Sequence, residues 1–518
     1  MANKTVFKVN GRQVAVPTDC VNEAGGQAYA LTDAEALCQY VVTSTFSDSF
    51  YITAADQLAK LQQLCKSVDP VLVAKAAVYG HENGKMKDAP AYLLAHLMSP
   101  STMGLFTKVF PRVITNVKML CTFVQIVRSG VTGRKSFGSA AKRLIQNWLT
   151  SKNGKQLFLA SIGHSDPSLV DILKMVHPKP ETRVQEALFA YLLGKTDKYT
   201  MSELPQLTQD FELFKKDNSR ALPDMDFRSL TNCNLTTAHW EQIALNMPWN
   251  TLRMNLNVLG RNGVFKNTAL TKVLADKLGD KKQVETFNVF PYQLLAAYLN
   301  VDENVPTTIG NSLQQAMEYA TKNVPVLGNR VGIAVDVSGS MNSPVTGSRP
   351  GAPPTMVMCS HVASLIASAL SRSNKEAVVV SFGTRARVVP KYNSWDSVMT
   401  NTEKLAQEGL WTGYGTNAGA AMQVFNAEGK FDFIVYVSDC QSWVGNNLMD
   451  LWAEQKRGNK KTRLAEINVQ AGTTVQAKSN DNSILNVGGF SDQVFDTLAR
   501  FVGEPNVNFL DVVKSVEL

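Results

Sequence analysis

Apolar positions along the chain change their period once, near residue 325. Before that point they recur every three or four residues in short segments, which indicates amphipathic helices. Beyond it, short apolar runs alternate with helical segments, which is typical of a mainly parallel sheet covered by helices. The apparent linker is Asn323–Asn329. We therefore predict an α-helical, HEAT-like solenoid over residues 1–325 and a doubly wound α/β domain over residues 326–518.

The predicted elements of the first part are all helices, and no strand signal is visible before residue 320. Thr32 and Glu35 form a capping box, and Asp166-Pro167 is a further predicted helix start. Other helices are expected at 54–66, 70–79, 91–98, 181–193, 237–246, 250–259, 269–278, 291–299 and 309–320. In the second part we expect strands at 330–336, 376–382, 386–390, 431–438 and 464–469, and helices at 355–371, 417–425, 446–456 and 491–502.

Oxygen-bearing side chains follow two of the predicted strands. Asp336 ends the first apolar run, and Ser338 and Ser340 follow at alternate positions, so a carboxylate and two hydroxyls can converge. Thr416 stands in a glycine-rich loop before a helix, and Asp439 ends the strand at 431–438. Because ligand sites in open α/β sheets lie at the carboxyl edge, these five residues are expected to form one site. Hard oxygen donors suit Mg²⁺ or another divalent cation.

This pattern resembles the von Willebrand factor A fold and its metal-ion-dependent adhesion site, which begins with Asp-x-Ser-x-Ser after a strand. The resemblance implies a coordination position left open for an acidic residue of a partner; a structural ion completed by water is the alternative. Asn417 stands where an aspartate often follows the threonine. A structural turn, hydrogen-bonded by its own serines, is the competing interpretation of the motif itself.

The positive charge of the chain is concentrated in one window. The net charge is +8, and no Asp or Glu occurs from Ala89 through Ser165. A single-sign stretch across packed helices favours a polyanionic partner such as nucleic acid. The alternative is a solvated surface whose acidic partners come from other helices. The basic residues of the window are Lys108, Arg112, Lys118, Arg128, Arg134, Lys135, Lys142, Arg143, Lys152 and Lys155.

An ordered series of motifs resembles the TROVE domain shared by telomerase-associated, Ro and vault proteins. No single motif is decisive, but together with the A domain the series covers essentially the whole chain, as in a bacterial or phage-borne Ro-type protein. The motifs are Asn22–Asp33 with Tyr51-Ile52, Lys85–Pro90, Gly138–Arg143 running to Trp148, His177–Pro180, Pro248–Arg253 with Asn257, and Phe290–Gln293.

The resemblance implies a monomeric helical ring, closed by the A domain, that binds RNA. Family members hold small noncoding Y RNAs on an outer basic face and take single-stranded 3′ ends of misfolded RNAs through the hole. Bacterial members are associated with exoribonucleases such as polynucleotide phosphorylase. A role in RNA stability or quality control is therefore expected here.

The residues expected to contact RNA follow the family motifs and the basic window. Arg134 and Lys135 lie in a glycine-flanked loop, and Lys142 and Arg143 are adjacent on a helix whose other face is apolar. Such cations hold phosphates without reading bases; solvation of a helix face is the alternative. The remaining candidates are Lys118, Arg128, His177, Lys179 and Arg253, of which His177 could also only cap its helix and Arg253 could only pack.

Other classes of function have less support. The five-residue site offers two carboxylates, whereas two-metal phosphoryl chemistry needs a carboxylate cluster, and no nucleotide-binding or zinc-protease motif is present. We expect a protein that is not an enzyme; a docking scaffold of the A-domain type without RNA function is the competing hypothesis. Seven scattered cysteines, no apolar run of membrane-spanning length and no signal peptide favour a cytoplasmic protein.

Overall fold

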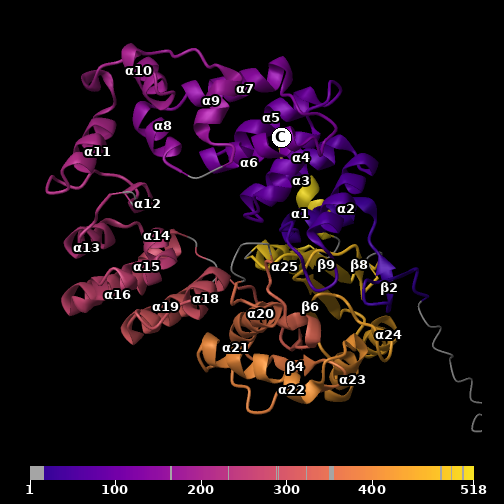
Figure 1. Ribbon diagram of the computed structural model, residues 1–518. Coiled ribbons are helices and arrows are strands. Elements are labelled where there is room, and N and C mark those ends of the chain that lie inside the picture. The colour runs from indigo at the N-terminus through magenta and orange to yellow at the C-terminus, as the bar shows by residue number, and fades with distance from the viewer. Residues whose placement is uncertain are drawn as a thin grey trace, which may run out of the picture. The chain divides into compact units, whose positions relative to one another are not determined.

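The computed structural model forms two compact units (Figure 1). It describes residues 17–518 except 164–165, 231–232, 288, 290, 322–323, 349–354, 479–480, 492 and 505–506. One unit contains residues up to Leu64, Val289–Leu299 and Met317–Val512; the other contains Cys65–Asn288, Asn300–Ala316 and Val513–Leu518. Both units are discontinuous in sequence. The predicted domain boundary between residues 325 and 326 divides the chain at one point, whereas each compact unit combines several segments. The boundary stays a prediction.

The second unit is built from helices that pack on their neighbours along the chain, as the apolar periodicity predicts (Figure 1). Helix α3 packs on α4 and α5, while α9 packs on both α6 and α7. A buried aromatic cluster of Phe106, Phe110 and Phe123 joins α5 to α6, with ring centroids 5.7–6.0 Å apart. The helices are α3 (Pro70–Glu82), α4 (Asp88–His96), α5 (Met103–Val113), α6 (Val117–Ser129), α7 (Gly138–Thr150), α8 (Gly154–Ser161), α9 (Leu169–Val176), α10 (Arg183–Leu192), α11 (Gln206–Lys216), α12 (Phe227–Leu230), α13 (Thr237–Asn246), α14 (Trp249–Met254), α15 (Leu256–Arg261), α16 (Thr268–Leu278) and α17 (Lys281–Thr286).

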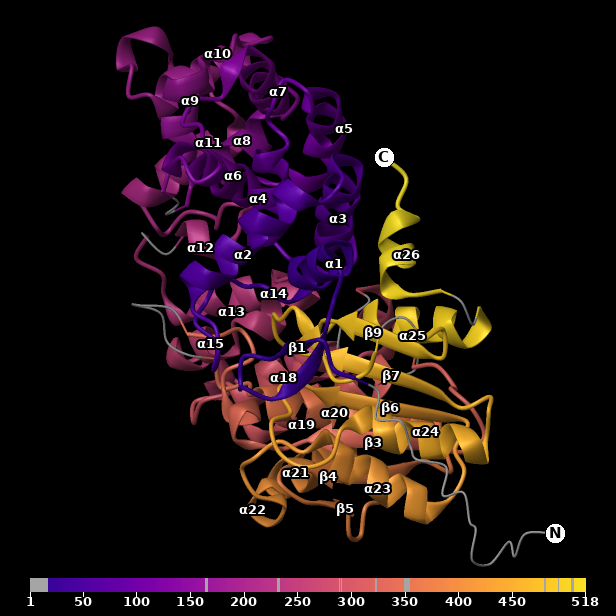
Figure 2. The same ribbon diagram turned by 90° about the vertical axis from the view of Figure 1, so that its right-hand side faces the viewer.

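The first unit is organised around a six-stranded sheet in the order β5-β4-β3-β6-β7-β9 (Figure 2). All neighbouring pairs are parallel except β4 and β5, which are antiparallel at one edge. The fully buried central strands β3 and β6 pair Ile333 with Val435. The elements are β3 (Val331–Asp336), β4 (Val378–Phe382), β5 (Ala386–Val388), β6 (Phe433–Ser438), β7 (Arg463–Asn468), β9 (Ile484–Gly488), α18 (Pro291–Leu299), α20 (Cys359–Ser373), α21 (Val398–Gln407), α22 (Gly409–Thr412), α23 (Ala418–Glu428), α24 (Leu448–Gly458) and α25 (Gln493–Gly503).

The expectation that the first 320 residues contain no strand is wrong. Strands β1 (Cys20–Val21) and β2 (Gln27–Ala30) form a small sheet with β8 (Thr474–Val475), and Tyr29 pairs with Val475. The next helix, α1 (Asp33–Thr43), packs against β9. The N-terminal segment is therefore an integral part of the α/β unit. Its strands have two and four residues, too short for a periodic signal, and the partner strand lies at the other end of the chain.

Local capping signals were informative but not uniformly correct. The capping box before α1 is present, with the Glu35 amide donating to Thr32 Oγ1 at 3.3 Å. Helix α9, however, begins at Leu169 with Ser168 as its cap, so the start predicted at Asp166-Pro167 is wrong. The helix predicted at 250–259 is divided at Asn255 into α14 and α15. Three further helices link the regions described above: α2 (Ala54–Ser67), α19 (Thr307–Ala320) and α26 (Phe509–Lys514).

Candidate functional site

The carboxyl edge of the parallel sheet gathers the predicted metal ligands. Asp336 is fully buried at the end of β3; its Oδ1 accepts from the Ser338 amide at 2.9 Å, and its Oδ2 accepts from the Ser438 hydroxyl at 2.6 Å. The Ser338 and Ser340 hydroxyl oxygens lie 3.4 Å apart. These contacts place one carboxylate and several hydroxyls around a common point. Ser438, the last residue of β6, is a contributor that the sequence analysis missed.

The other two predicted ligands come from neighbouring loops. Thr416 is buried, and its carbonyl accepts from the amides of Trp443 and Val444, which ties its loop to the segment that follows β6. In the same loop, the Tyr414 carbonyl accepts a hydrogen bond of 2.9 Å from the Gly339 amide. Asp439 is 2% exposed, and its Oδ1 accepts from the Gln441 amide at 3.2 Å. Three loops at one sheet edge thus hold the five predicted residues.

The chemistry of this cluster suits a divalent cation. Burial, followed by the nearby Asp336 carboxylate, raises the pKa of Asp439 to about 7. Burial also raises the pKa of Asp336. Asp439 Oδ2 is buried and has no hydrogen-bond partner among the described residues. Two close, buried carboxylates with an unsatisfied oxygen and adjacent hydroxyls would be neutralised and satisfied by Mg²⁺ or a similar ion. The residues present therefore fit the predicted cation.

A second buried carboxylate lies one strand away, on β7. Glu466 Oε2 accepts from the amides of Gln476 and Ala477 at 2.9 and 3.1 Å, which fixes the turn after β8. Burial raises the pKa of Glu466 to about 7. Its carboxyl therefore ionises more readily in the unfolded chain than in the native protein.

Replacing this carboxyl should flatten the pH dependence of stability. Because the folded pKa of Glu466 is raised, the native state retains its proton between pH 4.5 and 7, and stability falls as pH rises through this window. The difference between the free energy of unfolding of Glu466→Gln and that of the native chain should therefore shift in favour of the variant by up to about 3 kcal/mol as the pH rises from 4.5 to 7. Denaturant unfolding at pH 5, 6 and 7 measures it. Glu403→Gln, at an exposed position on α21, is the control and should show no such trend.

A group of basic residues lies where α6, α7 and α9 meet. We define the α7 surface as Arg128, Lys142, Arg143, His177 and Lys179. Gln146 of α7 donates through Nε2 to the Val176 carbonyl at 2.6 Å, which holds the end of α9 one helical turn from Lys142 and Arg143. Arg128 of α6 reaches the Met175 sulfur at 3.7 Å. His177 ends α9 in the left-handed conformation, with its side chain exposed. These predicted RNA contacts are therefore brought together.

Lys142 and Arg143 are available to a ligand. Neither makes an ion pair or side-chain hydrogen bond among the described residues, whereas the buried face of α7 contains Ala141, Ile145 and Leu149. The first turn of α7 carries no acid, and its N-cap residue Phe137 provides no side-chain cap. The free amides at that end add to a field that favours phosphate.

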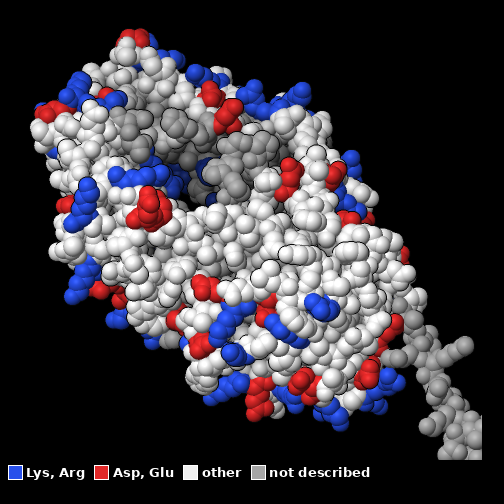
Figure 3. Space-filling model, turned by 60° about the horizontal axis from the view of Figure 1, so that its bottom comes forward, with Lys and Arg blue, Asp and Glu red and all other residues white. Residues whose placement is uncertain are grey.

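Other residues of the basic window are engaged within the protein. Arg112 forms a two-point ion pair with Glu82 at 2.6 and 2.7 Å, and Lys155 pairs with Asp224 at 2.8 Å. Arg134 donates to the Met98 carbonyl and fastens the loop before α7 to the end of α4. Lys135 and Lys118 are exposed. On the face shown in Figure 3, basic and acidic side chains are interspersed over most of the surface. The solvated-surface alternative therefore applies to part of the window.

Arg253 does not join the α7 surface. It lies on α14, is 7% exposed, and burial lowers its pKa to about 10. Asn257 donates through Nδ2 to the Asn300 carbonyl at 2.6 Å and accepts from the Asp302 amide at 3.1 Å. Both positions thus favour the packing alternative, and the RNA contact predicted for Arg253 has no support from its environment.

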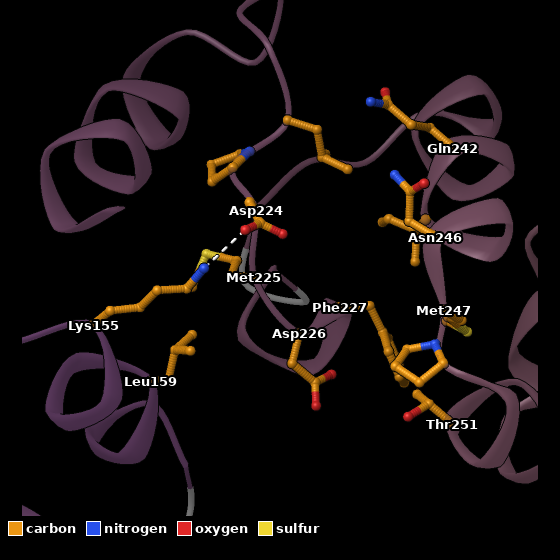
Figure 4. Close-up of a pocket in the computed structure, with 14 residues that line it drawn as sticks. Lys155, Leu159, Asp224, Met225, Asp226, Phe227, Gln242, Asn246, Met247 and Thr251 are labelled. Carbon is orange, nitrogen blue, oxygen red and sulfur yellow. Dashed lines mark hydrogen bonds and ion pairs between the residues drawn. The ribbon is translucent and has the colours of Figure 1, made fainter. Parts of the chain in front are cut away.

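The Lys155–Asp224 pair borders a cavity of about 420 Å³ in the helical unit (Figure 4). Figure 4 shows Gln242 and Asn246 of α13 on one side and Lys155 and Leu159 of α8 on the other, with the segment around Met225 between them. The cavity is lined by apolar and uncharged polar groups, by Asp224 and Asp226, and by Lys155, which is paired with Asp224. These carboxylates make it unsuited to phosphate, and it does not extend the α7 surface.

Comparison with known proteins finds that the C-terminal domain is similar to von Willebrand factor A domains. Residues 330–502 match the family model described as the Ro60 vWA domain. Over nearly its whole length the chain is similar to the RNA-binding protein RO60 of Deinococcus radiodurans, with 21% identity across 93% of this chain and 94% of the relative. The crystal structure of the D. radiodurans Ro (Rsr) protein has the same fold, with a TM-score of 0.62 and 16% identity over 92% of this chain and 100% of that one.

These matches confirm the resemblance to Ro-type proteins and the fold class, a helical part followed by an A domain. They also agree with the prediction that the chain is a binding protein and not an enzyme. None of the described helices is long and apolar enough to cross a membrane. None of the seven cysteines, all of which lie among the described residues, forms a disulfide.

Proposed function

We propose that this chain is an RNA-binding protein of Ro type that binds small, Y-like noncoding RNAs and single-stranded 3′ ends of misfolded RNAs. The observation that carries the proposal is the α7 surface, where Lys142 and Arg143 lie on an acid-free helix beside His177 and Lys179. Cations in such a row bind successive phosphates, and an exposed imidazole can stack on a base. The similarity to a relative named as an RNA-binding protein supports it.

The A domain would supply a separate docking site. Asp336, Ser338, Ser340, Thr416 and Asp439 would hold Mg²⁺ or another divalent cation, which would attract an acidic side chain of a partner. Tyr414 and Trp443, 68% and 51% exposed, lie in the two loops tied to Thr416 and offer apolar contacts around such an acid. A nuclease of the polynucleotide phosphorylase kind is the expected partner, with RNA quality control in the cytoplasm as the role.

An electrophoretic mobility shift tests the RNA function. A structured RNA with a single-stranded 3′ tail and the same RNA without it are compared at about 150 mM salt, because phosphate-driven affinity collapses as ionic strength rises. We expect both to bind and the tailed RNA to bind more tightly. Equal binding would restrict the function to docking structured RNAs. Binding of neither would favour the second candidate, an A-domain scaffold that docks proteins. The supporting observations for that candidate are the buried oxygen-bearing side chains at the sheet edge and the exposed Tyr414 and Trp443.

A further inference from the structure

The cavity beside the Lys155–Asp224 pair is used neither by the α7 surface nor by the predicted metal site. All the residues that line it belong to the helical unit, and they come from α8, from the segment that leads into α12, and from α13 and α14. Its volume of about 420 Å³ lies within the range typical of small-molecule sites. The cavity therefore has room for one small ring system.

The charges around this cavity exclude an anionic ligand. Lys155 is the one cation among the described lining residues, and its Nζ lies 2.8 Å from Asp224 Oδ2. Asp226 adds a second carboxylate, so one ammonium against two carboxylates leaves a net charge of −1. Because this field opposes phosphate, an uncharged ligand with hydrogen-bond donors suits the cavity better.

The buried part of the lining is apolar. We define the apolar floor as Phe227, Ile243 and Met247, all of which are buried. The Phe227 ring packs on Trp240 of α13 with centroids 5.9 Å apart, and Lys277 donates through Nζ to the Met247 carbonyl at 2.6 Å. These contacts fix the floor before a ligand arrives. A preformed apolar surface of this kind can cover the face of a flat ring.

Two amide side chains of α13 form the polar edge of the cavity. Gln242 and Asn246 stand four residues apart and therefore on one face of the helix. Figure 4 shows both on the same side of the cavity. Both are exposed, and neither side chain makes a hydrogen bond among the described residues. Because an amide donates and accepts at once, this pair can satisfy the mixed donors and acceptors of a nucleobase edge.

The carboxylate of Asp226 makes one base a better ligand than the others. Its Oδ1 accepts from the Arg228 amide at 3.0 Å, and its Oδ2 makes no hydrogen bond or ion pair among the described residues. A carboxylate only accepts, and its oxygens have capacity for further bonds. Guanine offers an imino and an amino group side by side as donors. Adenine and cytosine each offer one amino group beside a ring acceptor, so the carboxylate favours guanine.

We propose that this cavity is a guanine-binding site, in which Asp226, Gln242 and Asn246 contact the edge of the base and the apolar floor covers its face. The inference rests on the proposed binding of single-stranded 3′ ends, because an unpaired guanine in such an end is the expected ligand. Unstacked bases of single-stranded RNA are commonly held in this way, through their edges and faces. A free guanine nucleoside carries the same base and is the other source of the ligand.

RNA hairpins with a short 3′ uridine tail test the site on the full chain. One guanosine or one adenosine replaces each tail uridine in turn, and filter binding measures affinity at about 150 mM salt. We expect at least one position where guanosine binds about 10-fold more tightly than adenosine. Asp226→Asn should reduce this preference to within about 2-fold, because asparagine can still cap α12 but no longer presents a carboxylate. Asp217→Asn is the matched control and should keep the preference, since Asp217 also accepts from the amide two residues on, at 3.1 Å.

Saturation-transfer NMR with guanosine separates the two sources of the ligand. Guanosine binding that is lost in Asp226→Asn, without a preference among the tails, would keep the guanine site and assign it to a free nucleoside. Tailed RNAs that bind without preference for guanosine, together with no transfer to guanosine, would overturn the site and leave the RNA function intact. If guanosine bound but no tailed RNA did, the proposed function would fail and the site would stand.

Discussion

Reversing the charge of Lys142 and Arg143 together should weaken binding of structured RNA by more than about 100-fold at about 150 mM salt. Arg143 is exposed and Lys142 is half-buried, and neither makes an ion pair among the described residues, so the change adds local repulsion of phosphate without breaking an ion pair. The double variant K142E/R143E should therefore fold like the native chain. Filter binding and thermal unfolding measure the two effects.

The neutral variant K142A/R143A separates phosphate contact from long-range repulsion. If both residues contact phosphates, the slope of log affinity against log salt should decrease in magnitude by about two. Lys281→Glu with Lys282→Glu provides the control, because these are also adjacent basic residues exposed on a helix of the same unit; unlike Lys142 and Arg143, Lys281 pairs with an acid, Glu285, at 3.9 Å. Native RNA affinity in K142E/R143E, or an equal loss in the control pair, would show that the α7 surface is not the contact.

Helices and central strands of this protein could be predicted because their signals are local. The apolar spacing that predicts α13 and α18 depends only on residues within each helix, and the burial of β3 and β6 is evident from continuous apolar runs. The five predicted metal ligands follow from the same logic, since each stands just after a strand or before a helix. Parallel strands end at one edge, so the ligands can be grouped without knowing the loops.

The packing of the N-terminal segment on the loop after β6 could not be predicted, because its contacts join the two ends of the chain. Asn22 and Ser442 are separated by 420 residues, and the pairing of β2 with β8 spans a similar interval. Such pairings depend on the tertiary path of the chain, which a local pattern does not contain.

Sequence also could not separate free cations from engaged ones. Arg112, Lys155 and Lys142 stand in the same acid-free window, but the first two meet Glu82 and Asp224 from outside it. The acid-free stretch predicts net positive charge for the window but does not distinguish the residues that are paired with acids from those that are not. Burial of Arg253 is a similar case, because its environment is set by the helices packed around α14.

Replacing Asp336 with asparagine should raise the stability of the metal-free protein and abolish its response to divalent cations. The asparagine side chain keeps the shape of the carboxylate and still offers an oxygen that accepts from the Ser338 backbone amide. It carries no charge, so the repulsion between Asp336 and Asp439 is removed. In EDTA we expect a gain of about 1 kcal/mol, seen as an increase in Tm. Mg²⁺ should stabilise the native chain but not Asp336→Asn, and Mn²⁺ affinity should fall at least about 100-fold.

Asp336→Ala is the informative contrast. It also removes the charge, but it leaves the Ser338 amide and Ser438 hydroxyl without their acceptor, at a cost of about 1–3 kcal/mol for each buried group. Its Tm in EDTA should therefore lie below that of Asp336→Asn. RNA affinity should be unchanged in both variants, because the α7 surface belongs to the other compact unit. A loss of RNA binding parallel to the loss of metal would instead mean that the ion maintains the RNA-binding conformation. Equal Mg²⁺ stabilisation of the native chain and Asp336→Asn would refute the metal site.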